Sequence, residues 1–367
     1  MRFTHTGYAQ RIRFGPGVVG ELSTLLRDIG GRRIFLVTTE GRLASPDGER
    51  VAQVIGRELI STFAGVTPHV PTPAVQAAVQ QARRDAVDAV VSFGGGSCAD
   101  LAKAVCYFTE REAGTPGATW LDRPALPHVA IPTTYSGAEL TPFFGMTDPA
   151  TRRKSGAGGP TTAPVAAVYD PLVTLDTPAR VSAETGMNAL AHGVEAIYAT
   201  RRTPEAEAVA LACVQRVAAS LPGVVEDPGD VSARTAMLVG AALGGRALQN
   251  ASMGVHHGLA QLLGGRTGIA HGLANALMLA HVVRFNAEAV PVDVARIGAA
   301  LGEPDDAAGA CDRLRARLGL PGRLSECGVT EEDLDAVARM SQGNANVALN
   351  PRPVSEEAAR EILAEAW

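Results

Sequence analysis

The stretch that decides the fold joins an apolar run to a glycine-rich turn and a helix. It reads Ala89-Val90-Val91-Ser92-Phe93-Gly94-Gly95-Gly96-Ser97-Cys98-Ala99-Asp100-Leu101-Ala102-Lys103. Glycines after a strand let the backbone approach a pyrophosphate, and the N-terminus of the following helix offers free N–H groups and a positive dipole end. The pattern is neither a P-loop nor the usual G-x-G-x-x-G fingerprint. It predicts a phosphate-binding turn, with an ordinary strand-to-helix turn as the alternative.

Strand and helix patterns alternate around this stretch. Apolar runs predict strands at 34–39, 128–134 and 165–169, and helical spacing predicts a helix at 74–87. Strands that alternate with helices indicate parallel pairing in a doubly wound sheet. The first part of the chain is therefore predicted to be a Rossmann-like α/β domain.

The second part of the chain has a different texture. From Ala179 the sequence is rich in Ala, Leu and Val with helical periodicity almost to its end, and we expect a break at Leu221-Pro222-Gly223. The sequence thus predicts an α/β dinucleotide-binding domain over residues 1–158 and an all-helical substrate domain over 159–367. A cleft between the two would hold the glycine turn, because ligands bind at the carboxyl ends of parallel strands.

Composition excludes several classes of protein. The 367 residues are 46% hydrophobic and 19% charged, which rules out a disordered chain, and a net charge of −5 argues against a nucleic-acid partner. We find no apolar run of about 18 residues and no apolar segment after Met1 of the secretory kind, so no membrane partner is expected. The five cysteines form no C-x-x-C pair, which is typical of reduced thiols in a cytoplasmic protein.

Lysine is nearly absent from the chain. Of 33 basic residues only Lys103 and Lys154 are lysines. Either these two are chance survivors of a bias toward arginine, or both positions need a compact ammonium that a guanidinium cannot replace.

Histidines concentrate in the helical part. Five of the eight lie between His192 and His281, and Asn188 stands one helical turn before His192. A single histidine in an apolar helix is usually a core residue, whereas His192, His257 and His271 on neighbouring helices indicate a polar pocket. A zinc or iron site would need three or four such ligands, including a carboxylate.

These motifs together resemble the iron-containing alcohol dehydrogenase superfamily along nearly the whole chain. The matching segments are Gly94 to Lys103, Ile131-Pro132-Thr133-Thr134, Thr185 to Ala196, and the 14-residue spacing from His257 to His271. Within the superfamily the chain is most similar to the maleylacetate reductase branch, through Pro132 to Pro142 and Gly186-Met187-Asn188-Ala189. The resemblance implies the dehydroquinate synthase-like fold of this superfamily, a doubly wound domain followed by a helical one.

The resemblance also implies an NAD(P)H-dependent reductase that acts on a carboxylated enone or carbonyl, such as maleylacetate, which is reduced to 3-oxoadipate in aromatic catabolism. Its coenzyme positions correspond here to Thr39, Gly94, Gly95, Gly96, Ser97, Asp100, Thr133, Thr134, Tyr135 and Lys154. Thr39 carries no charge and Arg42 follows it, so the choice between NADH and NADPH stays open. We expect a homodimer.

The metal-dependent branch has an Asp at the position of Asn188, besides the histidines at His192, His257 and His271. A neutral amide is a poorer ligand for a divalent ion than a carboxylate, so no metal is expected, with weak ligation by Asn188 as the alternative. We assign His257 as proton donor, His192, His271 and Asn188 as pocket residues, and Tyr135 as the second candidate donor.

Gln261 stands where both branches often have a second histidine, and glutamine cannot act as a general acid. Two other functions therefore remain open. One is a metal-dependent alcohol dehydrogenase or dehydroquinate-synthase-like lyase, which a bound Fe or Zn would reveal. The other is an inactive NAD(P)-binding homologue, which would bind coenzyme without turnover.

Overall fold

The computed structural model describes residues 2–114, 124–151 and 153–367. The chain forms two compact units: Gly7–Thr177, and Pro178–Trp367 together with the N-terminal segment Met1–Thr6. The first is an α/β unit and the second is helical, so the predicted fold class is confirmed. The predicted boundary after residue 158 is too early, because Ala166–Tyr169 is a strand of the first unit's sheet.

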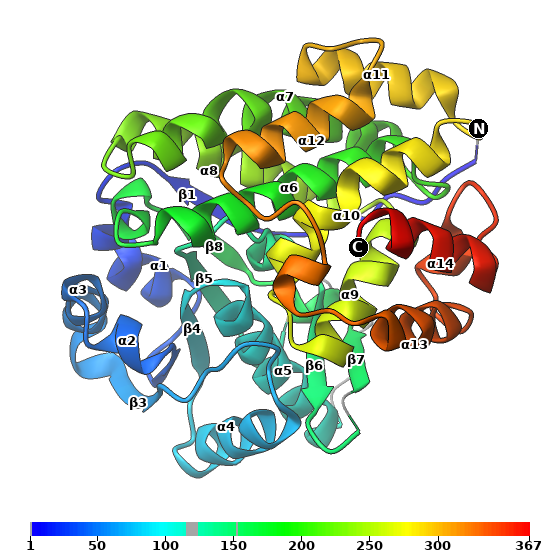
Figure 1. The fold of residues 1–367 in the computed structure, drawn as a ribbon. Helices are drawn as coiled ribbons and strands as arrows, with labels where there is room; N and C mark the ends of the chain where they lie inside the picture. The colour runs from blue at the N-terminus through cyan, green and yellow to red at the C-terminus, as the bar shows by residue number, and fades with distance from the viewer. Residues whose placement is uncertain (1, 115–123, 152) are drawn as a thin grey trace. The chain divides into compact units, whose positions relative to one another are not determined.

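A parallel six-stranded sheet forms the centre of the α/β unit (Figure 1). Every strand pair in it is parallel. In spatial order the strands are β1 (Arg11–Phe14), β8 (Ala166–Tyr169), β5 (His128–Pro132), β4 (Ala89–Gly94), β2 (Ile34–Val37) and β3 (Leu59–Phe63). The four central strands are buried throughout, as expected for a parallel sheet covered on both faces.

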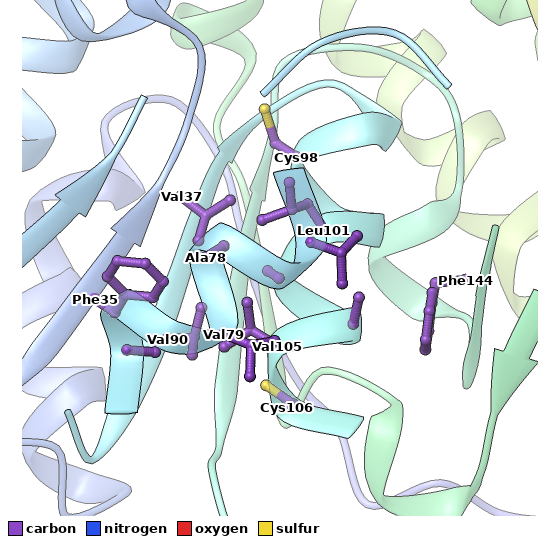
Figure 2. Close-up of a cluster of buried hydrophobic side chains, with 14 of the residues drawn as sticks. Phe35, Val37, Ala78, Val79, Val90, Cys98, Leu101, Val105, Cys106 and Phe144 are labelled. Atoms are coloured by element: carbon purple, nitrogen blue, oxygen red, sulfur yellow. The ribbon is translucent and has the colours of Figure 1, made fainter. Parts of the chain in front are cut away.

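Alternate residues of β2 and β4 pack on opposite faces of this sheet. Phe35, Val37 and Val90 join α4 (Thr72–Arg84) and α5 (Gly96–Glu112) in one core cluster, which Figure 2 shows. Ile34, Leu36, Val91 and Phe93 join α1 (Leu22–Asp28) and α3 (Pro46–Ile55) on the other face. Helices therefore cover both faces of the sheet.

The chain changes direction between β2 and β4. After β2 it passes through α2 (Glu40–Leu43) and α3 on one face to β3, at the edge of the sheet. After β4 it passes through α5 on the other face to β5, on the opposite side. The carboxyl ends of β2 and β4 are thus a topological switch point, where open α/β sheets bind ligands.

A small antiparallel hairpin completes the α/β unit. It consists of β6 (Phe143–Asp148) and β7 (Arg153–Gly158). The buried Lys103 of α5 joins the hairpin and the preceding 3₁₀ turn η3 (Ala138–Leu140) to the sheet layer, because its Nζ donates to Phe143 O, Ala138 O and Thr141 Oγ1 at 2.5, 2.9 and 2.9 Å. These contacts favour the interpretation that position 103 needs a compact ammonium, because its three hydrogens match three oxygen acceptors.

The helical unit contains nine α-helices among the described residues. They are α6 (Ala179–Tyr198), α7 (Pro204–Glu226), α8 (Val231–Leu248), α9 (Val255–Thr267), α10 (His271–Asn286), α11 (Pro291–Leu301), α12 (Ala307–Arg317), α13 (Glu331–Ser341) and α14 (Glu356–Glu365). The break expected at Leu221-Pro222-Gly223 is wrong, because α7 continues through Pro222 to Glu226. A proline so near the carboxyl end interrupts only the last turn.

One described helix, α7, is long and apolar enough to cross a membrane, judged by length and composition alone. This differs from the expectation that no segment would qualify. The helix also carries Glu205, Glu207 and Arg216, and it packs against α6 and α8 within its own unit. These neighbours cover part of the surface of α7.

Candidate functional site

The glycine turn lies at the carboxyl end of β4, and it leaves no room for side chains. Gly94 has a φ of 146°, and a β-carbon there would lie 2.5 Å from Cys98 Sγ. A β-carbon on Gly96 would lie 2.9 Å from Ser136 Oγ. Gly95 is the N-cap of the 17-residue α5 and, as a glycine, makes no side-chain cap hydrogen bond to the first N–H groups of the helix. With Ser97 in the first turn, these residues fit a pyrophosphate.

The segment after β5 borders the glycine turn. Thr133 N donates to Gly94 O at 2.9 Å, and a β-carbon on Gly95 would lie 3.2 Å from Thr134 Cγ2. Tyr135 is fully buried in the same segment. The structure thus brings Thr133 and Thr134 to the glycine turn.

Asp100 and Lys154 form a second polar group in this unit. The Asp100 carboxylate forms an ion pair with Lys103, with Oδ1 2.8 Å from Nζ, and its Oδ2 accepts from Gly145 N at 3.2 Å. Lys154 on β7 crosses Gly145 so closely that a β-carbon there would lie 2.7 Å from Lys154 Cε. Lys154 is half-buried and makes no hydrogen bond among the described residues. Burial lowers the pKa of its ammonium, and the nearby Asp100 carboxylate reverses part of that decrease. An ammonium without a hydrogen-bond partner among the described residues is suited to a hydroxyl or phosphate of a ligand.

We expect Lys154→Ala to weaken coenzyme binding by about 10- to 150-fold, because a hydrogen bond to a charged group is worth roughly 1.5–3 kcal/mol. Fluorescence titration with NADH and NADPH measures the dissociation constants. The melting temperature should change little, since the ammonium has no described hydrogen-bond partner to lose. Unchanged coenzyme affinity would remove Lys154 from the coenzyme site.

Thr39 lies at the switch point, after β2. Its hydroxyl accepts from Arg42 N at 3.1 Å and caps α2. The Arg42 guanidinium donates to Thr177 Oγ1 at 2.6 Å, and Thr177 Oγ1 donates to Thr133 O at 2.7 Å. Arg42 is therefore connected to the segment beside the glycine turn, a link that the sequence did not predict.

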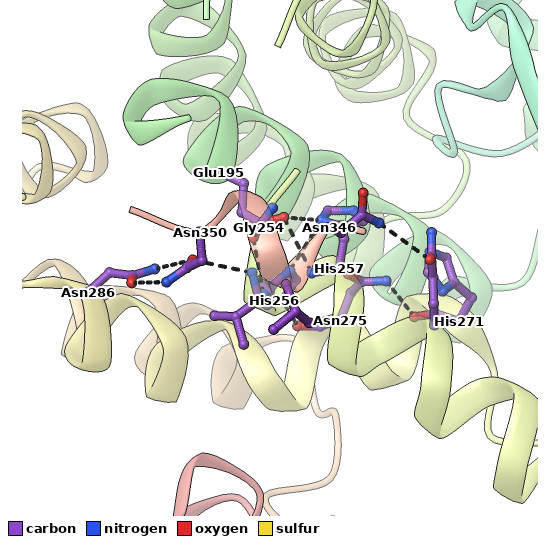
Figure 3. A network of polar contacts seen from close by, with 12 residues as sticks. Glu195, Gly254, His256, His257, His271, Asn275, Asn286, Asn346 and Asn350 are labelled. Carbon is purple, nitrogen blue, oxygen red and sulfur yellow. Dashed lines mark hydrogen bonds and ion pairs between the residues drawn. The ribbon is translucent and has the colours of Figure 1, made fainter. Parts of the chain in front are cut away.

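The second candidate site lies in the helical unit, around a buried carboxylate. Glu195 of α6 is fully buried, and its Oε1 accepts from Gly254 N and His256 N, both at 3.0 Å. Its Oε2 accepts from His257 Nδ1 at 2.6 Å and from His257 N at 3.3 Å (Figure 3). Burial raises the pKa of Glu195, but the hydrogen bond and charge of His257 lower it further, so the pKa is below its ordinary value. Glu195 is an anion bound to the N-terminus of α9.

These contacts determine the tautomers of two histidines. His257 Nδ1 carries the hydrogen that Glu195 accepts, so the Nε2 of a neutral His257 ring is an acceptor. His256 Nε2 donates to Asn275 O at 2.9 Å, which leaves its Nδ1 as an acceptor 3.3 Å from His257 Nδ1. Burial lowers the pKa of His256 to about 4, so this second ring stays neutral. A proton gained at His257 Nε2 would make an imidazolium beside a carboxylate.

The histidines predicted from the sequence lie close together. The His192 and His257 rings stack with centroids 4.7 Å apart, and the His257 and His271 centroids are 6.1 Å apart. Both His192 Nδ1 and His257 Nε2 are buried without a hydrogen-bond partner among the described residues. Burial, together with the neighbouring His257 and His256, lowers the pKa of His192 well below its ordinary value. Buried polar atoms of this kind normally have a partner, so the cluster is suited to a polar ligand.

One cluster of side chains in the helical unit could hold a metal ion. Among the described residues, the one group of His, Cys, Asp and Glu with all ligand atoms within 4.8 Å of one another is Glu195, His256 and His257. Most of its polar atoms are engaged with one another, with backbone N–H groups or with Asn275 O, and His257 Nε2 is the one left without a partner among the described residues. The positions that correspond to metal ligands in the metal-dependent branch are held here by three imidazoles and by the neutral amide of Asn188. Asn188 lies one turn before His192 on α6.

Sequence reasoning missed Glu195 and His256. The spacing carried a usable signal, because Glu195 follows His192 by three residues and so lies near the same face of α6. Its partners at the start of α9 are about 60 residues further along the chain, and nothing in the sequence pairs them with it.

Comparisons with known proteins agree with both units. Residues 9–171 match the family model for iron-containing alcohol dehydrogenase, and residues 182–367 match the model for the C-terminal part of the Fe-containing alcohol dehydrogenase family. A maleylacetate reductase of Rhizobium sp. (strain MTP-10005) is 34% identical, over all of this chain and 97% of that protein. The crystal structure of a maleylacetate reductase from Agrobacterium tumefaciens is 32% identical with a TM-score of 0.88, over 100% of this chain and 98% of that one. A 1,3-propanediol oxidoreductase structure, 29% identical, has a TM-score of 0.93 over the full length of both chains.

Proposed function

Because this chain belongs to the iron-containing alcohol dehydrogenase family, we propose that it is a metal-independent reductase of maleylacetate or a closely related carboxylated enone or carbonyl. The family assignment makes it an NAD(P)H-dependent oxidoreductase. The observation that carries the proposal is the Glu195–His257 pair beside His192, which provides a proton donor without a metal. Full-length relatives that are maleylacetate reductases support the substrate class.

In this proposal the α/β unit binds the coenzyme. The groups we assign to it are the glycine turn with Ser97, the segment Thr133, Thr134 and Tyr135, and the side chains of Asp100, Lys154 and Thr39. When bound, NAD(P)H supplies a hydride to an electron-poor carbon of the substrate. The fit of the glycine turn to a pyrophosphate supports this assignment.

The helical unit supplies the proton. Hydride transfer to an enone leaves an anion, which needs an acid within hydrogen-bond reach. The Glu195 carboxylate holds the His257 ring in one orientation and stabilises its protonated, imidazolium form. His257 then gives up the proton from Nε2 to the substrate anion. His192 stacks on the His257 ring, while His271 and Asn188 complete the polar surroundings. Tyr135 is the alternative donor.

The direct test follows coenzyme oxidation with both NADH and NADPH against maleylacetate and a panel of uncarboxylated enones, ketones and aldehydes, with and without EDTA. We expect turnover of maleylacetate that EDTA leaves unchanged. Loss of activity with EDTA, restored by Fe or Zn, would favour a metal-dependent alcohol dehydrogenase. Tight coenzyme binding without turnover of any substrate would favour an inactive homologue.

We expect Asn188→Asp to raise metal affinity, because it adds a carboxylate next to three imidazoles. Atomic absorption on purified protein should give less than stoichiometric Fe and Zn for the wild type and more for the variant. Asn188→Leu serves as a control that removes the amide without adding charge. One tightly bound metal ion per wild-type chain would contradict the metal-independent mechanism.

The proposal includes a cytoplasmic homodimer. The five cysteines are free thiols, and four are buried; burial raises the pKa of Cys98 to about 12, so it is not a reactive thiolate. Strand β1 lies at an edge of the sheet with all four residues exposed, among them Ile12 and Phe14. Such an edge supports association of the chain with a second copy.

A further inference from the structure

We propose that Gln261 and Asn346 form an amide clamp that binds a carboxylate of the substrate one helical turn from His257. Gln261 would touch the substrate, and Asn346 would act as a positioning residue for Gln261. The inference rests on the proposed function, since it names how that site recognises a carboxylated substrate.

Gln261 lies on the same side of α9 as the proton donor. Residues four apart on a helix have their β-carbons about 5–6 Å apart, and Gln261 follows His257 by four. The Gln261 side chain is half-buried. Its position therefore allows a ligand at His257 Nε2 to reach the amide as well.

Asn346 determines which end of this amide is available. Asn346 Nδ2 donates to Gln261 Oε1 at 3.4 Å, which turns the Nε2 of Gln261 away from Asn346. No described residue accepts a hydrogen bond from Gln261 Nε2, so its two hydrogens are available to a ligand. An amide NH₂ group directed in this way is a donor to a carboxylate.

The turn that carries Asn346 is itself held firmly. Asn344 Oδ1 accepts from Asn346 N at 2.9 Å and from Val347 N at 3.2 Å. The turn η7 (Val347–Leu349) packs so tightly on α9 that a β-carbon on Gly258 would lie 2.5 Å from Val347 Cγ2. The clamp is therefore built in advance, and binding would cost little side-chain entropy.

Independent atoms in the same cluster point to a polar ligand. His192 Nδ1 and His257 Nε2 belong to side chains that are more than nine-tenths buried, and neither atom has a hydrogen-bond partner among the described residues. A ligand with both a reacting centre and a carboxylate would engage His257 and Gln261 at once. An uncharged donor also suits this position. A cation that held the substrate carboxylate here would compete with His257 for Glu195, whereas the amide of Gln261 does not.

The test compares Gln261→Leu, Gln261→Glu and Asn346→Ala with wild type. We expect Gln261→Leu to raise the KM for maleylacetate about 10- to 100-fold, since a hydrogen bond to a charged group is lost. Gln261→Glu should raise it more through like-charge repulsion, and Asn346→Ala about 3- to 10-fold. The KM for an uncarboxylated enone and the coenzyme affinity should change less than threefold. Gln342→Glu, an exposed glutamine at the end of α13, controls for the added charge.

A second measurement separates this inference from the proposed function. Calorimetry with NAD⁺-saturated protein and adipate, an unreactive six-carbon dicarboxylate, should show binding that Gln261→Leu weakens by the same factor. If maleylacetate is reduced normally but Gln261→Leu affects carboxylated and uncarboxylated substrates alike, the clamp is wrong. If adipate binding depends on Gln261 while maleylacetate is not reduced, the clamp stands and the proposed reaction fails.

Discussion

Replacing His257 with alanine is expected to lower kcat by about 10²- to 10⁴-fold, the usual contribution of a general acid. The ring is fully buried between Glu195 and His192, and its Nε2 is the atom left available for a proton. Coenzyme affinity should change little, because the residues assigned to coenzyme binding belong to the α/β unit. Steady-state kinetics with maleylacetate, together with coenzyme titration, would measure both effects.

Companion variants show whether His257 transfers the proton or only fills space. His257→Gln keeps a polar side chain of similar size but cannot supply a proton near neutral pH, so its kcat should be as low as that of the alanine variant. Glu195→Gln in the His257→Ala background should cause little further loss in kcat, because Glu195 acts through the missing ring. Near-normal kcat in His257→Gln, with a large loss in Tyr135→Phe, would assign the proton to Tyr135 instead.

Much of the α/β unit could be predicted because its signals are local. The run Ala89 to Phe93 is continuous and apolar since both faces of β4 are covered, and the glycine turn follows it directly. The strand at Ala166–Tyr169 was also predicted, yet it was assigned to the wrong domain. Residues 155–160 are rich in turn formers and therefore resemble a linker between domains. The chain nevertheless returns to the sheet after them, where β8 pairs with β1 and β5 from distant parts of the sequence.

The candidate site in the helical unit was only half predictable. His192, His257 and His271 were found from their positions on helices, and the rings do lie next to each other. The carboxylate that orients His257 was not found, because its role depends on tertiary packing of α6 against the start of α9. The same limit applied to Lys103. Its place in the glycine motif gives no sign of its partners, because the three oxygens that accept its hydrogen bonds come from residues 35 to 40 positions later.

Lys103→Met is expected to destabilise the protein by about 1–3 kcal/mol, the usual cost of leaving a buried hydrogen-bond acceptor unsatisfied. The substitution keeps the length of the side chain but removes the ammonium that donates to Ala138 O and Phe143 O and forms the ion pair with Asp100. Because these acceptors belong to η3 and β6, the loss should also loosen the β6–β7 hairpin. Urea unfolding followed by circular dichroism measures the free energy of unfolding.

The other lysine of the chain provides the matched control for this variant. Lys154→Met should change the free energy of unfolding by less than about 1 kcal/mol, because the half-buried Lys154 ammonium makes no hydrogen bond among the described residues that the substitution would remove. Lys103→Arg keeps the charge but brings a planar guanidinium to a site built for three converging N–H bonds, so it should also destabilise the protein measurably. Equal stabilities of Lys103→Met and Lys154→Met would show that the contacts of Lys103 do not hold the hairpin. The larger predicted loss of stability at position 103 explains why lysine persists there. Apart from Lys103 and Lys154, every basic residue of the chain is an arginine.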